Sequence, residues 1–333
     1  MVEIREMELR LRRRWAIARG AADAKRNFVI RVTHEGIVGE GEAAFHRLYG
    51  EEPGSVLGEL EAMGNRIVLG QEGPELDEDF KGAAGAALDM ALLDWRAKKE
   101  ERKLGEYLGI AVPGESFVTS YSIGIDDIGG TATRVREADG FRVLKVKLGS
   151  RSGDDRERFE AVRAVTDVPV RVDANGGWGS VDEAAAMIEW LAARGVELVE
   201  QPFAPGRLEE TAVLRERSAL PLVADEDVRV AADVAGLAGI YDGINIKLMK
   251  AGGIREALRT AREAKRLGMR IMFGCMIESS LGIGAALHLA SLGDWIDLDG
   301  HLLIGNDPYD GIRCEGGRLH LPEGHGIGVH LRA

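Results

Sequence analysis

The feature that most constrains the fold of this chain is a repeat that begins after Pro113. Short apolar segments, typical of buried strands, alternate there with amphipathic segments that are typical of helices. A polar residue ends each apolar segment, at intervals of 22 to 28 residues. The eight predicted strand ends are Ser122, Lys147, Asp173, Glu200, Asp225, Lys247, Cys275 and Asp297. Eight strands that alternate with helices match a parallel β/α barrel better than a doubly wound sheet.

One repeat unit shows how such a segment is built. Ser180, followed three residues later by Glu183, has the pattern of a capping box, which starts a helix by satisfying its first backbone N–H groups. Apolar residues then recur at helical spacing, at Ala184, Met187, Ile188 and Leu191. Gly195 predicts the end of the helix before the apolar segment 196–200. The unit therefore predicts a helix followed by a strand.

The residues before the repeat follow a different pattern. Apolar and polar residues tend to alternate at 2–11 and at 28–32, which predicts antiparallel strands. His34-Glu35-Gly36 predicts a turn after the second of these segments. Between Gly82 and Lys99, small and large apolar residues recur at helical spacing, which predicts a helix. This part of the chain is expected to form an α+β unit.

The two patterns predict two domains. With 333 residues, of which 45% are hydrophobic, the chain is long enough for one large domain and a smaller companion. We predict an α+β domain at 1–112 and a barrel domain at 113–309. The tail, from about 310 to 333, is expected to cover the barrel or to join the first domain.

The balance of charge limits the expected partners. The chain has 43 lysines and arginines against 55 aspartates and glutamates, a net charge of −12. This charge repels phosphate backbones and anionic lipids, so neither nucleic acid nor a membrane surface is expected as a partner. A small molecule is the expected partner, and assembly into a homo-oligomer stays open.

The N-terminal residues and the cysteines indicate the compartment. Residues 1–15 are rich in Arg and Glu and lack an apolar core, so they do not predict a signal peptide. No apolar run approaches the roughly 18 residues of a spanning helix. Cys275 and Cys314 lie outside any Cys-x-x-Cys spacing, so neither a disulfide framework nor a zinc site is expected. The expected location is the cytoplasm, with both thiols reduced.

Three successive predicted strands end in a carboxylate, namely Asp173, Glu200 and Asp225. The active site of a β/α barrel lies at the C-terminal ends of its strands. Three carboxylates directed at one axial space repel each other unless a hard divalent cation lies between them. Alternatively, each of them begins a loop or caps the next helix. The shared register of the three favours a metal site.

Lysines end the strands on either side of these carboxylates. Lys145 and Lys147 share one face of their strand because alternate residues point the same way. Strands two and six lie on opposite sides of an eight-stranded ring, so Lys147 and Lys247 are expected to face each other. A nearby Mg²⁺ lowers the pKa of a lysine, which can then act as a base near neutral pH. Alternatively, these lysines reach to the barrel rim or bridge the carboxylates.

These motifs together resemble the muconate lactonizing subgroup of the enolase superfamily. In order, they are Lys-Val-Lys at 145–147, Asp-Ala-Asn at 173–175, Glu-Gln-Pro at 200–202, Ala-Asp-Glu at 224–226 and Asn-Ile-Lys-Leu-Met-Lys-Ala-Gly-Gly at 245–253. The resemblance covers the whole chain and implies an α+β capping domain followed by a (β/α)7β modified TIM barrel. One departure is Asp227, where members of the subgroup often have Ser after Ala-Asp-Glu.

The resemblance also implies roles for the polar strand ends. Asp173, Glu200 and Asp225 would bind Mg²⁺. Lys147 and Lys247 would be the acid and base that move a proton next to a carboxylate, and the metal would stabilise the resulting enediolate. Lys145 would help to hold the substrate carboxylate or tune its neighbour.

The eighth predicted strand narrows the reaction. Its run Trp-Ile-Asp-Leu-Asp-Gly at 295–300 resembles the Asp-x-Asp motif of dipeptide epimerases, in which Asp297 and Asp299 would bind the substrate ammonium. Alternatively, these two acids only solvate a loop. The resemblance further implies that main-chain groups of Cys275 and Ile277 line the dipeptide, with Ser122 opposite.

The resemblance also implies that the side chain of the substrate is selected by the first loop of the capping domain, as is usual in this subgroup. Here this loop is residues 15–20, and the cations Lys25 and Arg26 follow it. A cation such as Arg19 suits an acidic side chain, for example Glu in an Ala-Glu dipeptide. Alternatively, Trp15 and Ile17 select an apolar side chain.

The sequence therefore predicts a dipeptide epimerase that inverts the Cα of the C-terminal residue in dipeptides of the L-Ala-L-Xaa type. The alternatives within the subgroup are an N-acylamino acid racemase, an o-succinylbenzoate synthase and a muconate cycloisomerase. A non-catalytic barrel that binds a metal or a small acid is an alternative of another class.

Overall fold

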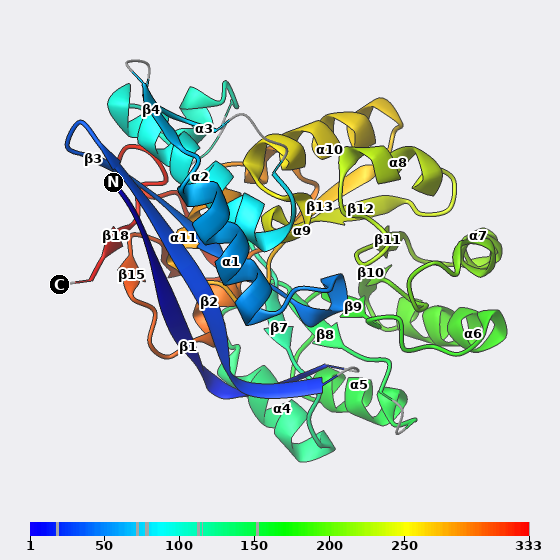
Figure 1. The fold of residues 1–333 in the computed structure, drawn as a ribbon. Coiled ribbons are helices and arrows are strands. Elements are labelled where there is room, and N and C mark those ends of the chain that lie inside the picture. The colour runs from blue at the N-terminus through cyan, green and yellow to red at the C-terminus, as the bar shows by residue number, and fades with distance from the viewer. Residues whose placement is uncertain are drawn as a thin grey trace.

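The computed structural model of the chain combines an N-terminal antiparallel sheet with a ring of parallel strands (Figure 1). It describes residues 1–17, 20–70, 73–76, 80–111, 114, 116–150 and 153–332. The long N-terminal strands curve along one side of the ring, and the far end of their hairpin reaches the region of α4, α5 and β8 (Figure 1). This hairpin therefore lies where it can contribute side chains to one end of the ring.

Eight parallel strands form the central sheet, and their spatial order follows the sequence. They are β7 (Tyr121–Ile123), β8 (Leu144–Lys147), β9 (Val170–Asp173), β10 (Val196–Glu200), β11 (Leu222–Ala224), β12 (Gly243–Ile246), β13 (Arg270–Gly274) and β14 (Trp295–Asp297). The backbone N–H of Ser120, next to β7, donates to the carbonyl of Ile296 in β14 over 3.1 Å. This bond brings the first and last strands together, and the predicted (β/α)7β barrel is confirmed.

Helices connect the strands on the outside of the ring. They are α4 (Ile128–Glu137), α5 (Asp155–Arg163), α6 (Val181–Ala192), α7 (Leu208–Arg217), α8 (Ala231–Leu237), α9 (Leu248–Ala251), α10 (Ile254–Arg266) and α11 (Ser280–Leu287), with the 3₁₀ turn η2 (Ala290–Leu292). A further 3₁₀ turn, η3 (Gly300–Leu303), follows the last strand. Ser180 caps α6 as predicted, because its hydroxyl accepts from the N–H of Glu183. The Glu183 carboxylate instead accepts from the N–H of Gly179, so the reciprocal bond of a capping box is displaced by one residue.

The inside of the ring is filled below the polar strand ends. Leu198, Val223 and Met272 form a buried apolar cluster from three of the strands. Glu200 and Asp225 follow two residues after Leu198 and Val223, and residues two apart in a strand point to the same face. The carboxylates therefore project inward, on top of an apolar layer. All eight predicted strand ends lie at, or within one residue of, the end of an observed strand.

The N-terminal part forms a second layer of structure. Its main sheet consists of β1 (Val2–Ile17), β2 (Gly20–His34) and β3 (Ile37–Ala43). Further elements are η1 (Arg47–Tyr49), α1 (Pro53–Gly64), β4 (Val68–Gly70), β5 (Gly73–Glu75), α2 (Gly82–Lys99) and α3 (Leu104–Tyr107). The predicted turn joins β2 to β3, with positive φ angles at Glu35 and Gly36. The first two strands extend much further than the alternation predicted, so that Trp15–Ile17 and Gly20–Ala22 are paired strand residues.

Close packing of β3 against α2 requires glycine. A Cβ atom on Gly39 would lie 2.0 Å from the carbonyl oxygen of Ala91, and one on Gly41 would lie 1.8 Å from that of Ala87. The small residues on both surfaces therefore let the helix backbone approach the strand directly. This contact anchors the N-terminal sheet next to the barrel core, to which Ala86 of the same helix contributes.

The C-terminal tail contacts both parts. Its strands are β15 (Tyr309–Asp310), β16 (Arg313–Glu315), β17 (Arg318–His320) and β18 (His330–Leu331), and β17 pairs with β6 (Ser116–Val118). The N–H of Ile327 donates to the carboxylate of Asp94 in α2 over 2.8 Å. The proposed domain boundary between residues 112 and 113 stays a prediction.

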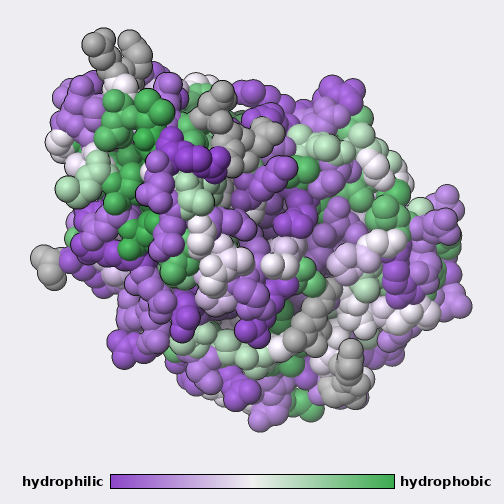
Figure 2. All heavy atoms as spheres, viewed as in Figure 1, coloured by the Kyte–Doolittle hydropathy of each residue, from purple (hydrophilic) through white to green (hydrophobic). Residues whose placement is uncertain are grey.

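The face of the molecule shown in Figure 2 is mostly hydrophilic, with apolar side chains gathered in one area over β4. Val68 and Leu69 of this strand are among the exposed large apolar residues. Within the described residues, no helix combines the length and the apolar character that crossing a membrane requires.

Candidate active site

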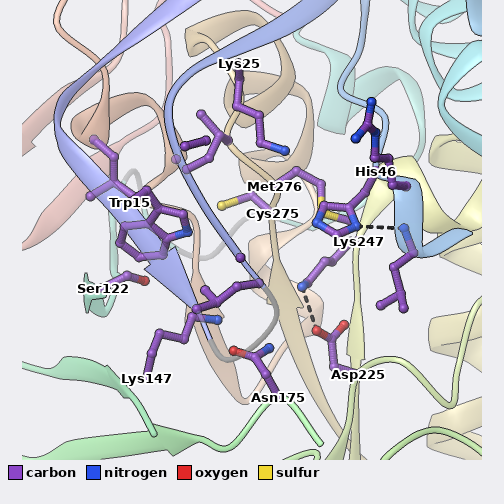
Figure 3. A pocket seen from close by; sticks show the side chains of 18 of the residues that line it. Trp15, Lys25, His46, Ser122, Lys147, Asn175, Asp225, Lys247, Cys275 and Met276 are labelled. Carbon is purple, nitrogen blue, oxygen red and sulfur yellow. Dashed lines mark hydrogen bonds and ion pairs between the residues drawn. The ribbon is translucent and has the colours of Figure 1, made fainter. Parts of the chain in front are cut away.

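A cavity of about 440 Å³ lies over the C-terminal ends of the barrel strands. Lys147, Asp225 and Lys247 line it from the barrel, while Trp15 and Lys25 line it from the N-terminal hairpin (Figure 3). Cavities of this size hold small-molecule ligands. The cavity therefore combines the polar strand ends of the barrel with side chains of the cap.

The three predicted metal ligands come together below this cavity. One carboxylate oxygen from each of Asp173, Glu200 and Asp225 lies within 4.8 Å of the others, and all three residues are buried. Their strands β9, β10 and β11 are neighbours in the sheet, so their carboxyl ends share one edge of the barrel. The register of the strands brings the carboxylates together, as predicted.

The chemistry of this cluster fits a divalent cation. Burial and the neighbouring Asp173 raise the pKa of Glu200 to about 7. Oε2 of Glu200 makes no hydrogen bond to any described residue, although the Lys145 ammonium lies 2.7 Å away. Carboxylate oxygens that are crowded together and incompletely hydrogen-bonded suit a hard cation such as Mg²⁺. The residues present therefore fit the predicted metal.

Lys147 and Lys247 enter the cavity from opposite sides of the ring. They lie at the ends of β8 and β12, four strands apart, and both side chains point toward the cavity above Asn175 (Figure 3). Nζ of Lys147 is 2.6 Å from Asp173 Oδ2, and Nζ of Lys247 is 2.8 Å from Asp225 Oδ2. Each lysine is therefore held by one of the candidate metal ligands.

The environment of Lys247 favours its charged form. Burial disfavours the charge, but the carboxylate of Asp225 outweighs this effect, so the pKa of Lys247 is well above its usual value. The protein groups alone thus raise the pKa of Lys247, whereas a nearby cation is expected to lower it.

Lys145 lies deeper than the other two lysines. Its Nζ is 2.7 Å from Glu200 Oε2 and from Asp297 Oδ2, and 3.3 Å from Asp173 Oδ2. Burial opposes its charge, but Asp297 and the other carboxylates raise its pKa well above the usual value. The carboxylates therefore favour the charged form of Lys145, which ties the carboxylate cluster to β14.

Asp297 and Asp299 both line the cavity, but they differ in their partners. Asp297 accepts from Lys145 and from the hydroxyl of Ser120 over 2.6 Å. Asp299 Oδ2 accepts from the backbone N–H of Ser122 over 2.6 Å. Burial and the neighbouring Asp297 raise the pKa of Asp299 to about 7. Of the two, Asp299 is the carboxylate that lacks a cationic partner within the described residues.

The other predicted substrate contacts also line the cavity. Ser122 enters from β7, and Cys275 and Ile277 enter from the segment after β13. The Ile277 carbonyl accepts from the side-chain amide of Asn27 in β2 over 3.0 Å, which ties this segment to the cap. Burial raises the pKa of the Cys275 thiol well above its usual value, so the thiol stays neutral.

The predicted selector Arg19 lies outside the described residues. Trp15 and Ile17, on one side of it, and Lys25, on the other, line the cavity. Burial and the nearby Arg47 lower the pKa of Lys25. The cap side of the cavity thus carries both apolar and cationic groups.

Two residues of the site were missed by sequence reasoning. Asn245 donates to Glu200 Oε1 over 2.9 Å, and Nζ of Lys250 lies 2.6 Å from Asp225 Oδ1. Asn245 could have been found, because it precedes Lys247 by two residues and shares its face of the strand. Lys250 gave no such signal, since its contact depends on the turn of α9.

Comparison with known proteins identifies the family. The model of the enolase C-terminal domain-like family matches residues 127–333, which is more than half of the chain. The chain belongs to the enolase superfamily. Among relatives of this superfamily member, the L-Ala-D/L-amino acid epimerase of Pedosphaera parvula is 38% identical and aligns over 98% of this chain and 97% of the relative. The L-Ala-D/L-Glu epimerase of Bacteroides thetaiotaomicron is 37% identical, over 97% and 85% of the two chains.

A solved structure supports the same placement within the superfamily. The dipeptide epimerase of Enterococcus faecalis V583, complexed with Mg and the dipeptide L-Leu-L-Tyr, superposes with a TM-score of 0.89. It is 31% identical, and the alignment covers 98% of each chain. The predicted resemblance of this superfamily member to dipeptide epimerases is confirmed.

Proposed function

We propose that this chain is a dipeptide epimerase that inverts the Cα of the C-terminal residue in dipeptides of the L-Ala-L-Xaa type. The observation that carries the proposal is the placement of Lys147 and Lys247 at the ends of β8 and β12, on opposite sides of one cavity. A carbon atom held between two such lysines can lose a proton from one face and gain one on the other. The names of the relatives point to the same class of reaction.

The proton transfer proceeds in two halves. One lysine, in its neutral form, takes the proton from Cα, and the electron pair of the C–H bond moves into the substrate carboxylate. The opposite lysine, in its ammonium form, donates a proton to the other face of the same carbon. Lys147 serves as base for one stereoisomer and Lys247 for the other. One lysine ends with a proton gained and the other with a proton lost, and exchange with solvent restores both.

The carboxylate of the substrate needs positive charge as it becomes more negative. Asp173, Glu200 and Asp225 would hold Mg²⁺ for this purpose, and the bound cation would stabilise the additional charge. Lys145, 2.7 Å from Glu200, supplies a fixed positive charge in the same region. Positive groups placed next to this growing negative charge stabilise the transition state more than the ground state. This difference accelerates the reaction.

The amino terminus of the dipeptide is assigned to Asp299, with Asp297 beside it. A carboxylate and an ammonium form a charge-assisted hydrogen bond, which is stronger than a neutral one. The rival activities within the subgroup act on compounds without a free ammonium, and they would leave Asp299 buried without a cation. These two carboxylates therefore favour a dipeptide over an N-acylamino acid, a succinylbenzoate or a muconate.

The decisive experiment is incubation with a dipeptide library in deuterated water. We expect a mass gain of one unit in those dipeptides whose C-terminal Cα is exchanged, together with the appearance of the second diastereomer. Exchange confined to N-acyl amino acids would contradict the dipeptide assignment. No exchange in any carboxylate-containing compound would favour a non-catalytic barrel.

Further expectations from the sequence accompany this proposal. The chain is expected to act in the cytoplasm, without nucleic acid or membrane partners. The dipeptide library also distinguishes an acidic C-terminal side chain, which Arg19 and Lys25 would favour, from an apolar one, which Trp15 and Ile17 would favour. Assembly into a homo-oligomer remains open, and sedimentation of the purified protein tests it.

A further inference from the structure

Gln201 occupies an unusual place directly after the candidate metal ligand Glu200. Its side chain is completely buried, and its backbone has a φ of 40°. A positive φ is uncommon for a residue with a side chain, and it persists only where the surroundings compensate the strain. The hydrogen bonds of this side chain supply that compensation.

The oxygen of the Gln201 side chain accepts three backbone N–H groups in a row. Oε1 lies 3.0 Å from the nitrogen of Asp225, 3.0 Å from that of Glu226 and 3.3 Å from that of Asp227. The chain turns away from β11 at these residues, so their N–H groups have left the strand ladder. One amide oxygen thus fixes the backbone that carries the ligand Asp225.

The nitrogen of the same amide is held on the opposite side. Nε2 donates to Asp227 Oδ2 over 2.8 Å and to the carbonyl of Phe203 over 2.9 Å, and it lies 3.3 Å from the hydroxyl of Tyr241. The Tyr241 hydroxyl donates to Asp227 Oδ2 over 2.7 Å, and the N–H of Gly206 donates to Oδ1 over 2.7 Å. Among the described residues, only acceptors surround Nε2 apart from this hydroxyl, and only donors surround Oε1. The network therefore allows one orientation of the amide.

We propose that Gln201, Asp227 and Tyr241 form a clamp that positions Asp225 for metal binding. The inference rests on the proposed role of Asp225 as a metal ligand. Gln201 links this ligand to Glu200, since it follows Glu200 in the chain and holds the backbone of Asp225. Asp227, the position at which the chain departs from the subgroup pattern, orients the Gln201 amide. Tyr241 in turn orients Asp227, so all three are positioning residues rather than catalytic ones.

The clamp holds the backbone N–H of Asp225, whereas the lysines hold its carboxylate and, in the case of Lys250, also its backbone carbonyl over 2.6 Å. Lys247 and Lys250 hold its carboxylate through Oδ2 and Oδ1, at 2.8 Å and 2.6 Å. Gln201 holds its backbone, so the carboxylate keeps its position even when a cation competes with the lysines for its oxygens. Groups that orient metal ligands typically contribute 10- to 100-fold in metal affinity.

The test uses Gln201→Glu, which keeps the size and the accepting oxygen but places a second carboxylate oxygen against Asp227. Mg²⁺ affinity of the full chain is measured by calorimetry at pH 8. We expect a loss of about 10- to 100-fold in affinity. Asp227→Asn, added to this variant, supplies an amide donor opposite the new carboxylate. The double variant should bind Mg²⁺ about tenfold more tightly than the single variant, or better. Glu209→Gln, an exposed change on α7, is the control and should leave affinity unchanged.

The outcomes separate the clamp from the proposed function. Absence of Mg²⁺ binding by the unmodified protein overturns the metal assignment and the clamp with it. Normal binding by the unmodified protein and by Gln201→Glu overturns the clamp alone, as does a double variant no better than the single one. Should Gln201→Glu not fold, Tyr241→Phe carries the test, because it removes the hydroxyl that donates to Asp227 and lies near Gln201 Nε2. Its expected loss is about tenfold in Mg²⁺ affinity, and an unchanged affinity contradicts the clamp.

Discussion

Lys145 and Asp297 form a buried ion pair in which Nζ and Oδ2 are 2.7 Å apart. The pair joins β8 to β14 and supplies Asp297 with a cation from the protein itself. Asp299 has no ammonium or guanidinium within ion-pair distance in the described part of the chain, and its N–H partner is neutral. Binding of the substrate ammonium is therefore expected to depend on Asp299 more than on Asp297.

The first prediction concerns this ammonium. N-acetylation of a dipeptide substrate should reduce kcat/KM by roughly 10- to 1,000-fold, taking about 1.4 kcal/mol for each factor of ten. The physical reason is that a buried carboxylate left without its hydrogen-bond partner costs about 1 to 3 kcal/mol in free energy, and more when it is charged. Asp299→Asn should cause a comparable loss on free dipeptides. Steady-state kinetics with matched free and acetylated dipeptides measure both effects.

The same comparison discriminates between the rival reactions. An N-acylamino acid racemase would prefer the acylated compound, because it has no ammonium to bind. Faster turnover of N-acyl amino acids than of free dipeptides would therefore overturn the epimerase assignment while leaving the barrel, the metal site and the lysine pair intact.

The second prediction concerns metal removal. Chelation should abolish epimerisation and lower thermal stability, because three carboxylate oxygens within 4.8 Å then repel each other. Readdition of Mg²⁺ at 100 times its Kd should stabilise the folded chain by about 2.7 kcal/mol. Thermal unfolding and activity, followed with and without Mg²⁺, provide the measurement. Full activity after exhaustive chelation is incompatible with the metal proposal.

The third prediction separates the two lysines. Lys147→Ala and Lys247→Ala should each abolish epimerisation in both directions, because each direction needs one base and one acid. Each variant should retain Cα hydrogen exchange with only the stereoisomer whose base remains. Nuclear magnetic resonance in deuterated water follows this exchange for the two isomers. Lys265→Ala, an exposed change on α10, serves as the control. If both active-site variants exchanged both isomers as fast as the unmodified protein, the two-base assignment would be refuted.

The fourth prediction concerns the buried acids that connect the cap to the barrel. Glu42 of β3 accepts from the N–H and the hydroxyl of Ser279, next to Glu278. Burial and the neighbouring Glu42 raise the pKa of Glu278 to about 8. The folded state therefore holds a proton that the unfolded state releases near pH 4.5. The stability that this proton contributes is complete below pH 4.5 and is lost as the pH rises through 8.

Glu278→Gln should therefore flatten the fall in unfolding free energy between about pH 5 and pH 8. The variant keeps an oxygen for the N–H of Met276, which Glu278 accepts over 2.7 Å. We expect it to be more stable than the unmodified protein above pH 8, by an amount on the order of a few kcal/mol. Urea unfolding across this pH range measures the effect, with exposed Glu323→Gln as the control. Parallel stability curves for the unmodified and Glu278→Gln proteins would show that Glu278 does not titrate as described.

The sequence by itself determined the barrel and its polar strand ends. The repeat interval, the apolar runs and the carboxylates after them are local properties, and a strand buried on both faces needs an apolar run. Because residues two apart share a face, the common direction of Lys145 and Lys147 also follows from the sequence alone. Motif order then identified the superfamily.

Only the tertiary structure decided the partners of these side chains. The pair of Lys145 with Asp297 spans 152 residues, and the bonds of Gln201 to 225–227 span up to 26. Closure of the barrel and the turn after β11 create these contacts, and no local periodicity encodes them. The extended pairing of β1 with β2 was missed for the same reason, since its register shifts between Arg10 and Trp15 and breaks the alternation. The local sequence pattern determines which face of a strand a side chain lies on, whereas the packing of distant segments determines which residues it contacts there.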